Sequence, residues 1–135
     1  MVTDDIISAA RECIGTPFRH QGRVLGVGLD CVGVVIHALQ SVGVSIIDQC
    51  GYGRTPCNGL LEAAIGAHSE LIKVFTFMPG DILLMRILKQ PTHVAVFTGD
   101  TIIHAYEAVG KCCEHRLDSR WATCIVCSYR LKDAP

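Results

Sequence analysis

Hydrophobic residues in the first part of the chain recur at the spacing of an α-helix. The run from Ile6 to Ile14 places apolar side chains three and four residues apart, and Gly15 ends it. Thr3 precedes the run and is an expected N-cap, followed by two acidic residues that suit the positive end of the helix dipole. Farther along the chain, a weaker helix is also predicted over residues 58–67.

A second helical pattern begins at Cys31 and continues to Val42, and Gly43 ends it. Its β-branched residues have a weaker helical preference, which leaves a strand from Val32 to Ile36 as the alternative. The length of the pattern and the glycine at its end favour a helix.

The second half of the chain changes to a period of two, which is typical of strands. Pro91 is expected to interrupt the pattern, Thr98–Thr101 to form a tight hairpin turn, and Asp81 to belong to a turn. Helices followed by antiparallel strands predict a single α+β domain over residues 1–135. The expected strands are Leu71–Phe77, Ile82–Leu88, His93–Phe97, Thr101–Tyr106 and Ile125–Tyr129.

Composition narrows the class of protein. Half of the 135 residues are hydrophobic and 19% are charged, as in a folded domain. A net charge of −1 gives no basic field for nucleic acid or an anionic membrane, and no apolar run approaches the length of a transmembrane helix. Met1–Asp5 is acidic, unlike the start of a signal peptide. We therefore expect a protein made in the cytoplasm and kept there, or carried out by an assembly.

Eight cysteines are many for this length. Without an export signal, we expect most of them to be reduced core residues instead of four disulfides. Cys112, Cys113, Cys124 and Cys127 could form a four-thiolate zinc site, but in strands each pair would point to opposite faces. We therefore expect no metal and no cofactor.

Cys31 is the cysteine whose position indicates chemistry. At the first turn of a helix its sulfur would lie near unpaired backbone N–H groups, which favour a thiolate. Asp30 is a natural N-cap, and Gly33 would allow another element to approach closely. A cysteine nucleophile also needs a base and a group that orients the base.

Two histidines of the predicted hairpin meet that need. With Gly99 and Asp100 as loop residues, Ala95 pairs with His104, so that His93, Ala95, His104 and Tyr106 share one face. His93 and His104 are then diagonal neighbours, about 7–8 Å apart at the backbone. One imidazole would exchange a proton with the thiol. The other would hydrogen-bond to the first ring and fix the tautomer of that ring. For His68 and His115 we identify no partner.

Five sequence segments follow one another at a characteristic spacing: Gly15–Phe18 with Gln21–Gly22, Leu29–Val35, Pro79–Ile82, His93–Gly99 and Ile102–Ala105. Together and in this order, they resemble the NlpC/P60 cysteine peptidases. The resemblance covers Gly15 to about Ala105. The version with Phe-Arg-His-Gln-Gly-Arg and Asp-Cys-Val-Gly is most similar to the phage branch, which is encoded beside tail genes.

The resemblance implies a papain-like fold and cleavage of amide bonds in bacterial cell-wall peptides. Cys31 carries over as nucleophile, His93 as base and His104 as the orienting residue. The implied mechanism is thiolate attack, a tetrahedral oxyanion and a thioester that water hydrolyses. The implied partners are a peptidoglycan peptide as substrate and phage tail proteins as carriers.

The chain departs from the family pattern at two positions. Phe18 stands where the family often has a tyrosine, and Val32 replaces the usual serine. The role of the tyrosine hydroxyl would be lost or moved to His20 or Gln21, so Phe18, His20, Gln21 and Asp30 are candidate substrate contacts. Two alternatives stay open beside the hydrolase: an acyl- or amide-transferring thiol enzyme, and a non-catalytic tail or scaffold module.

Overall fold

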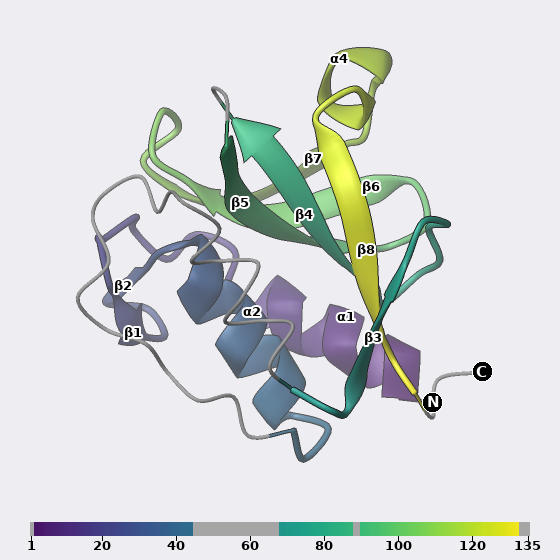
Figure 1. The fold of residues 1–135 in the computed structure, drawn as a ribbon. Coiled ribbons are helices and arrows are strands. Elements are labelled where there is room, and N and C mark those ends of the chain that lie inside the picture. Colours follow the sequence, from purple (N-terminus) through teal and green to yellow (C-terminus); the bar gives the residue numbers. More distant parts are fainter. Residues whose placement is uncertain (1, 45–67, 88–89, 133–135) are drawn as a thin grey trace.

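The computed structural model describes residues 2–44, 68–87 and 90–132, and it has an α+β architecture, as predicted. Two helices, α1 (Val2–Glu12) and α2 (Cys31–Gln40), lie side by side against one face of an antiparallel sheet (Figure 1). The helix expected over 58–67 lies outside the described residues. Among the helices of the described part of the chain, none is long and apolar enough to cross a bilayer.

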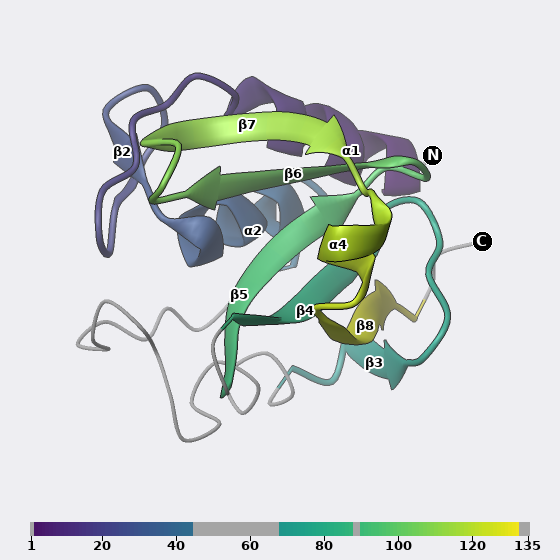
Figure 2. The same ribbon diagram turned by 90° about the horizontal axis from the view of Figure 1, so that it is seen from above.

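Within the described ranges, the main sheet has six strands in the order β3-β8-β4-β5-β6-β7, with every neighbouring pair antiparallel. A separate two-stranded ribbon, β1 (Arg23–Val24) with β2 (Gly28–Leu29), precedes α2. A short helix, α4 (Ser119–Ala122), lies on the side of the sheet away from α1 and α2 (Figure 2). The six strands are β3 (Leu71–Val74), β4 (Ile82–Ile87), β5 (Gln90–Phe97), β6 (Thr101–Tyr106), β7 (Lys111–Arg116) and β8 (Ile125–Leu131).

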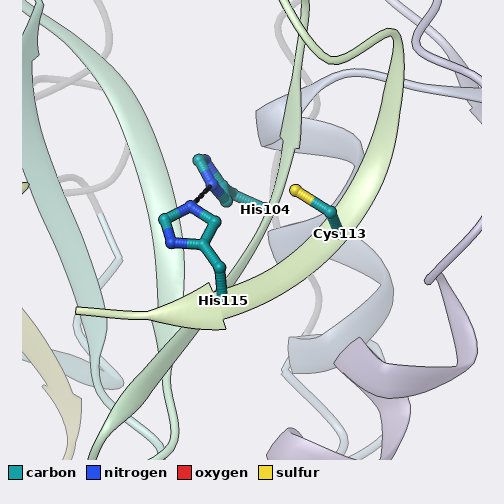
Figure 3. A group of neighbouring side chains, drawn as sticks. All are labelled: His104, Cys113 and His115. Atoms are coloured by element: carbon teal, nitrogen blue, oxygen red, sulfur yellow. Dashed lines mark hydrogen bonds between the residues drawn. The ribbon is translucent and has the colours of Figure 1, made fainter. Parts of the chain in front are cut away.

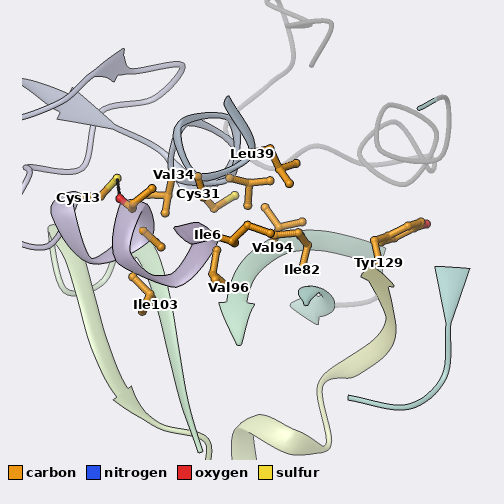
Figure 4. Packing of buried hydrophobic residues seen from close by; sticks show 14 of the residues in the cluster. Ile6, Cys13, Cys31, Val34, Leu39, Ile82, Val94, Val96, Ile103 and Tyr129 are labelled. Carbon is orange, nitrogen blue, oxygen red and sulfur yellow. Dashed lines mark hydrogen bonds between the residues drawn. The ribbon is translucent and has the colours of Figure 1, made fainter. Parts of the chain in front are cut away.

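The main core lies between the two helices and the sheet. Figure 4 shows Val34 and Leu39 of α2 facing the sheet, together with Val94 and Val96 of β5. All four side chains are almost fully buried. Burial of this size is the main source of stability in a small domain, at about 25 cal/mol per Å² of apolar surface. The helical pattern from Cys31 is thus confirmed over the strand alternative.

Two local predictions need correction, and one strand was missed. Helix α1 already includes Val2, which packs against the core, so Thr3 lies inside the first turn and is not the N-cap. Strand β5 continues through Pro91, and the β4–β5 pairing shifts between Met85 and Arg86. Proline is tolerated in a strand where the ladder is irregular. Strand β7 was not predicted, because it is a polar edge strand with only Cys112 fully buried.

The hairpin register is the one predicted. Val96 pairs with Ile103 and Phe97 with Ile102, which is the register that sets Ala95 opposite His104. The Thr98 N–H donates to the Thr101 carbonyl at 3.0 Å and closes the turn. This turn therefore determines that His93 and His104 lie on the same face of the sheet.

Asp81 does more than form the predicted turn. The turn is present, since the Asp81 N–H donates to the Met78 carbonyl and the Met78 N–H donates to the Asp81 carboxylate. The same carboxylate, 1% exposed, also accepts from the Ser128 hydroxyl and from two nitrogens of Arg130, at 2.8–2.9 Å. This pairing raises the pKa of Arg130. Asp81 therefore joins the turn before β4 to strand β8.

Candidate active site

Cys31 is the first residue of α2, directly after Asp30. The Asp30 carboxylate caps the helix by accepting the Gly33 N–H at 2.8 Å, as predicted. A Cβ at position 33 would overlap the backbone carbonyl of Gly22. The loop before β1 therefore packs directly onto the helix start, and this contact requires glycine at position 33.

The Asp30 carboxylate also holds the loop before β1 in place. Asp30 accepts the backbone N–H of Gln21 at 3.0 Å and Nη1 of Arg23 at 2.8 Å, and its side chain is only 5% exposed. Gln21 has a φ of 58°, so the loop turns in the left-handed region. Phe18 packs partly buried against the core, and His20 is partly exposed. The substrate contacts predicted for Phe18, His20, Gln21 and Asp30 stay predictions.

The Cys31 thiol is buried, and burial decides its protonation. Backbone N–H groups of Val94 and Val32 favour the thiolate, as expected for a helix start, but they act less strongly than burial and the Asp30 carboxylate. Together these effects raise the pKa of the Cys31 thiol to about 12. The expectation that the helix start would leave a thiolate is therefore wrong, because loss of solvent outweighs the helix terminus.

The contact with the Val94 N–H places the Cys31 sulfur where strands β5 and β6 separate. Along β5 the N–H groups alternate: that of Phe97 donates to Asp81 before β4, and that of Thr98 donates to Thr101 on the β6 side. The N–H of Val94 therefore points to the β6 side. The described β5–β6 pairing covers only Val96 and Phe97. The start of α2 thus meets β5 where β6 diverges, one residue from His93.

His93 and His104 are in direct contact. Nε2 of His93 lies 2.6 Å from Nδ1 of His104, and the rings meet edge to face. Both side chains are buried. Burial lowers the pKa of His93 to about 4 and that of His104 to about 2, so both rings are neutral near pH 7. Because His93 engages His104 through Nε2, its Nδ1 is the nitrogen left for a thiol.

His115, for which no partner was predicted, extends this pair. Its Nε2 lies 2.8 Å from Nε2 of His104, and its Nδ1 lies 3.0 Å from the carbonyl oxygen of Arg116. Strand β7 pairs with β6 so that Cys113 is opposite His104, which makes His115 a diagonal neighbour. The sequence signal that could have revealed this contact is the turn between Tyr106 and Lys111. A hairpin turn there sets the register that pairs His104 with Cys113.

With one proton on each ring, a single arrangement of protons satisfies these contacts. The Arg116 carbonyl can only accept, so His115 carries its proton on Nδ1 and accepts at Nε2. His104 must then donate from Nε2 and accept at Nδ1, and His93 must donate from Nε2. Nδ1 of His93 is left with a free lone pair. The chain of imidazoles therefore prepares His93 to accept a proton.

Aromatic side chains enclose the three rings. Tyr106 stacks on His104 with ring centroids 5.5 Å apart, and Trp121 of α4 meets both His104 and His115 at 5.2 Å. Trp121 was missed from the sequence, because α4 is too short to give a periodic signal. These aromatic surfaces contribute to the burial that lowers the pKa of His93 and His104.

None of the remaining described cysteines forms a disulfide. Cys112 and Cys127 lie in the core on the helical side of the sheet. Cys124 packs against the core on the other side, and Cys113 lies near His104 and His115. The members of each pair thus diverge, as predicted, and the four thiols do not converge on one zinc site.

The high pKa of Cys31 gives a testable pH dependence. We expect iodoacetamide to alkylate Cys31 more slowly than the partly exposed Cys124 at pH 7. Because pH 9 is still below a pKa of about 12, the rate at Cys31 should rise about tenfold per pH unit from 7 to 9. Peptide mass spectrometry follows each thiol in the same sample. A rate at Cys31 that is constant between pH 6 and 8 would indicate a thiolate–imidazolium pair and contradict this picture.

Comparisons with known proteins agree with this architecture. The model of the NlpC/P60 family matches residues 15–129. No curated protein matches the chain. Among solved structures, the NlpC/p60 domain of the peptidoglycan hydrolase SagA is 21% identical, with a TM-score of 0.68 over 96% of this chain and 98% of that one. An NlpC/P60 family protein from Bacillus cereus is 20% identical, with a TM-score of 0.69, and the chain covers 40% of it.

RipD from Mycobacterium tuberculosis, a non-catalytic NlpC/p60 domain protein adapted to peptidoglycan binding, also matches. It is 15% identical, with a TM-score of 0.64 over 99% of this chain and 98% of RipD. At these identities the likeness establishes the fold, which confirms the expected architecture. It does not decide between catalysis and binding, and that choice depends on the residues of the site.

Proposed function

Because the chain belongs to the NlpC/P60 family, we propose that it is a cysteine hydrolase that cleaves amide bonds in peptidoglycan peptides. The observation that carries this proposal is that the start of α2 meets β5 beside a paired histidine. The Cys31 sulfur contacts the backbone N–H of Val94, the residue that follows His93 in β5, and Nε2 of His93 contacts Nδ1 of His104. A nucleophile, a base and an orienting group are what amide cleavage by a thiol requires.

In the proposed reaction the Cys31 thiol and the His93 imidazole both start neutral. As the Cys31 sulfur attacks the amide carbon, its proton moves to Nδ1 of His93, and a tetrahedral oxyanion forms. The backbone N–H of Cys31, in the first turn of α2, would stabilise that oxyanion. His93 then returns the proton to the leaving amine as the C–N bond breaks, which leaves a thioester on Cys31.

Water completes the cycle. It attacks the thioester carbon while His93 accepts one of its protons, and the C–S bond breaks to release the acid. Cys31 recovers its proton from His93. The proposed orienting role of His104 rests on its Nδ1, which accepts from Nε2 of His93 and so leaves Nδ1 of His93 as the nitrogen that would serve as base.

The experiment that tests this function uses purified peptidoglycan stem peptides and mass spectrometry. The protein should produce two fragments, a new amine and a new carboxylic acid, and the acid should gain ¹⁸O when the reaction runs in labelled water. Transfer to an added amine without ¹⁸O would instead identify the thiol transferase. Peptide binding without any cleavage would place the chain with non-catalytic domains of the RipD kind, and would overturn the proposal.

We also propose that a phage tail or a similar assembly delivers the protein, synthesised in the cytoplasm, to the cell wall. The support is the resemblance of the segments around Cys31 and His20 to the tail-associated branch of the family. Tail particles containing a tagged copy should retain the protein through density-gradient purification. Recovery of the tagged copy only as free protein would count against this proposal.

A further inference from the structure

We propose that His104, Cys113 and His115 form a binding site for Zn²⁺, and that metal bound there switches off His93. The metal-binding part stands on the geometry of these three side chains alone. The switching part rests on the proposed function of Cys31 and His93. The site differs from the four-thiolate arrangement considered above, because it uses one cysteine and two imidazoles.

The three ligands converge because of strand geometry. Cys113 and His115 are two residues apart on β7 and so share a face, and His104 is paired with Cys113 on β6. Figure 3 shows the three side chains gathered on one side of these two strands. Their ligand atoms all lie within 4.8 Å of one another.

A tetrahedral zinc ion fits this group after small movements. Zn–N bonds of about 2.0–2.1 Å and a Zn–S bond of about 2.3 Å need ligand atoms about 3.3–3.6 Å apart. The two Nε2 atoms, now at 2.8 Å, must separate slightly, and the Cys113 sulfur must move closer. His104 is fully buried and fixed, while Cys113 and His115 are partly exposed and can adjust. A set of two imidazoles and one thiolate suits Zn²⁺ and leaves a fourth position for water.

The hydrogen bond of His115 to the chain already suits metal binding. Its Nδ1–H donates to the carbonyl of Arg116, so Nε2 presents a lone pair toward the site. A ligating histidine that donates its other ring proton to a carbonyl is the common arrangement around zinc, since that bond fixes the tautomer and the ring orientation.

Metal binding would reverse the hydrogen bonds of the other two imidazoles. To bind zinc through Nε2, His104 must carry its proton on Nδ1, where it becomes a donor to Nε2 of His93. His93 must then carry its own proton on Nδ1. Each ring keeps one proton, and only Cys113 releases a proton to solvent. The nitrogen of His93 that served as base is now a donor, so it cannot accept the proton of Cys31.

Binding is tested first without catalysis, in a Cys31→Ala background that removes the nucleophile as a competing ligand. We expect one Zn²⁺ per chain by calorimetry, and Co²⁺ should give the absorption of a tetrahedral thiolate site. Adding Cys113→Ser should weaken Zn²⁺ binding at least tenfold. Cys124→Ser, which removes another partly exposed thiol, should leave the affinity unchanged. Equal affinity with and without Cys113→Ser would overturn the site.

The switch is tested on the imidazoles directly. Nitrogen-15 spectra of the same protein should show His93 changing from the Nε2–H to the Nδ1–H tautomer as Zn²⁺ is added. Bound zinc with an unchanged His93 tautomer would overturn the switch but not the site. These readouts need no turnover, so an absence of peptide cleavage would count against the proposed function alone.

An active protein allows one more comparison. Zn²⁺ should inhibit the wild-type protein at concentrations that leave Cys113→Ser active relative to its own metal-free rate. Equal inhibition of the two proteins would place the inhibitory metal elsewhere, such as on Cys31, and would contradict the switch.

Discussion

Cys31→Ala is expected to lower the rate of peptide cleavage about ten-thousand-fold or more, without unfolding the protein. The size of the effect follows from losing the nucleophile of a covalent mechanism, since the remaining groups can only assist a direct attack by water. Alanine suits the first turn of a helix, and Asp30 still caps α2 through Gly33. Initial rates from the mass-spectrometric assay measure the loss, and urea unfolding checks the fold.

Cys13→Ala is the matched control for this variant. Cys13 is a second buried thiol of the same core, and its sulfur donates to the Ala9 carbonyl at 3.6 Å, away from His93. Its replacement should reduce stability by an amount typical of a small core truncation and leave the cleavage rate close to wild type. If Cys31→Ala cleaved peptides at the rate of Cys13→Ala, Cys31 would not be the nucleophile.

Asp81→Ala is expected to lower the free energy of unfolding by about 3–5 kcal/mol, the largest loss of stability that we predict. The substitution removes an almost fully buried carboxylate, and the Arg130 guanidinium, 17% exposed, loses its charged partner and keeps only its hydrogen bonds to Thr76. The Ser128 hydroxyl and the Met78 N–H also lose their acceptor. Urea unfolding measures the change, since the midpoint shifts at a constant slope.

The double variant Asp81→Ala with Arg130→Met separates the cause from a general loss of packing. Removing the stranded charge as well should recover part of the lost stability, because the cost of an unpaired buried charge exceeds that of its apolar replacement. If the double variant were less stable than Asp81→Ala by the full cost of Arg130→Met alone, the two residues would be independent, and the pairing would not be what stabilises the turn.

The histidine pair could be predicted from the sequence because it depends on one short-range feature. Thr98–Thr101 closes a hairpin, and the period of two then sets which residues share a face. The same reasoning would place His115 beside His104 only if the register of the second hairpin, β6–β7, were also predicted. Strand β7 is hard to recognise in the sequence because it is polar, and a strand at the edge of a sheet needs few apolar residues.

The protonation of Cys31 could not be predicted in the same way. Its position at a helix start is local and visible in the sequence, and that part of the prediction is confirmed. How far solvent is removed from the sulfur depends on the packing of α2 against β5 and β6, which lie more than fifty residues away in the chain. A local pattern carries no information about that burial, and burial dominates the pKa.

The position of β8 has a consequence for synthesis on the ribosome. This strand comes after the other described strands in the chain but lies between β3 and β4 in the sheet. Until it emerges, β4 lacks one neighbour, β3 lacks its partner, and Asp81 lacks Arg130. Pairings of long sequence separation also form late, because they close large loops. A nascent chain should therefore be unable to cleave peptides until β8 is in place, which would limit premature activity during synthesis.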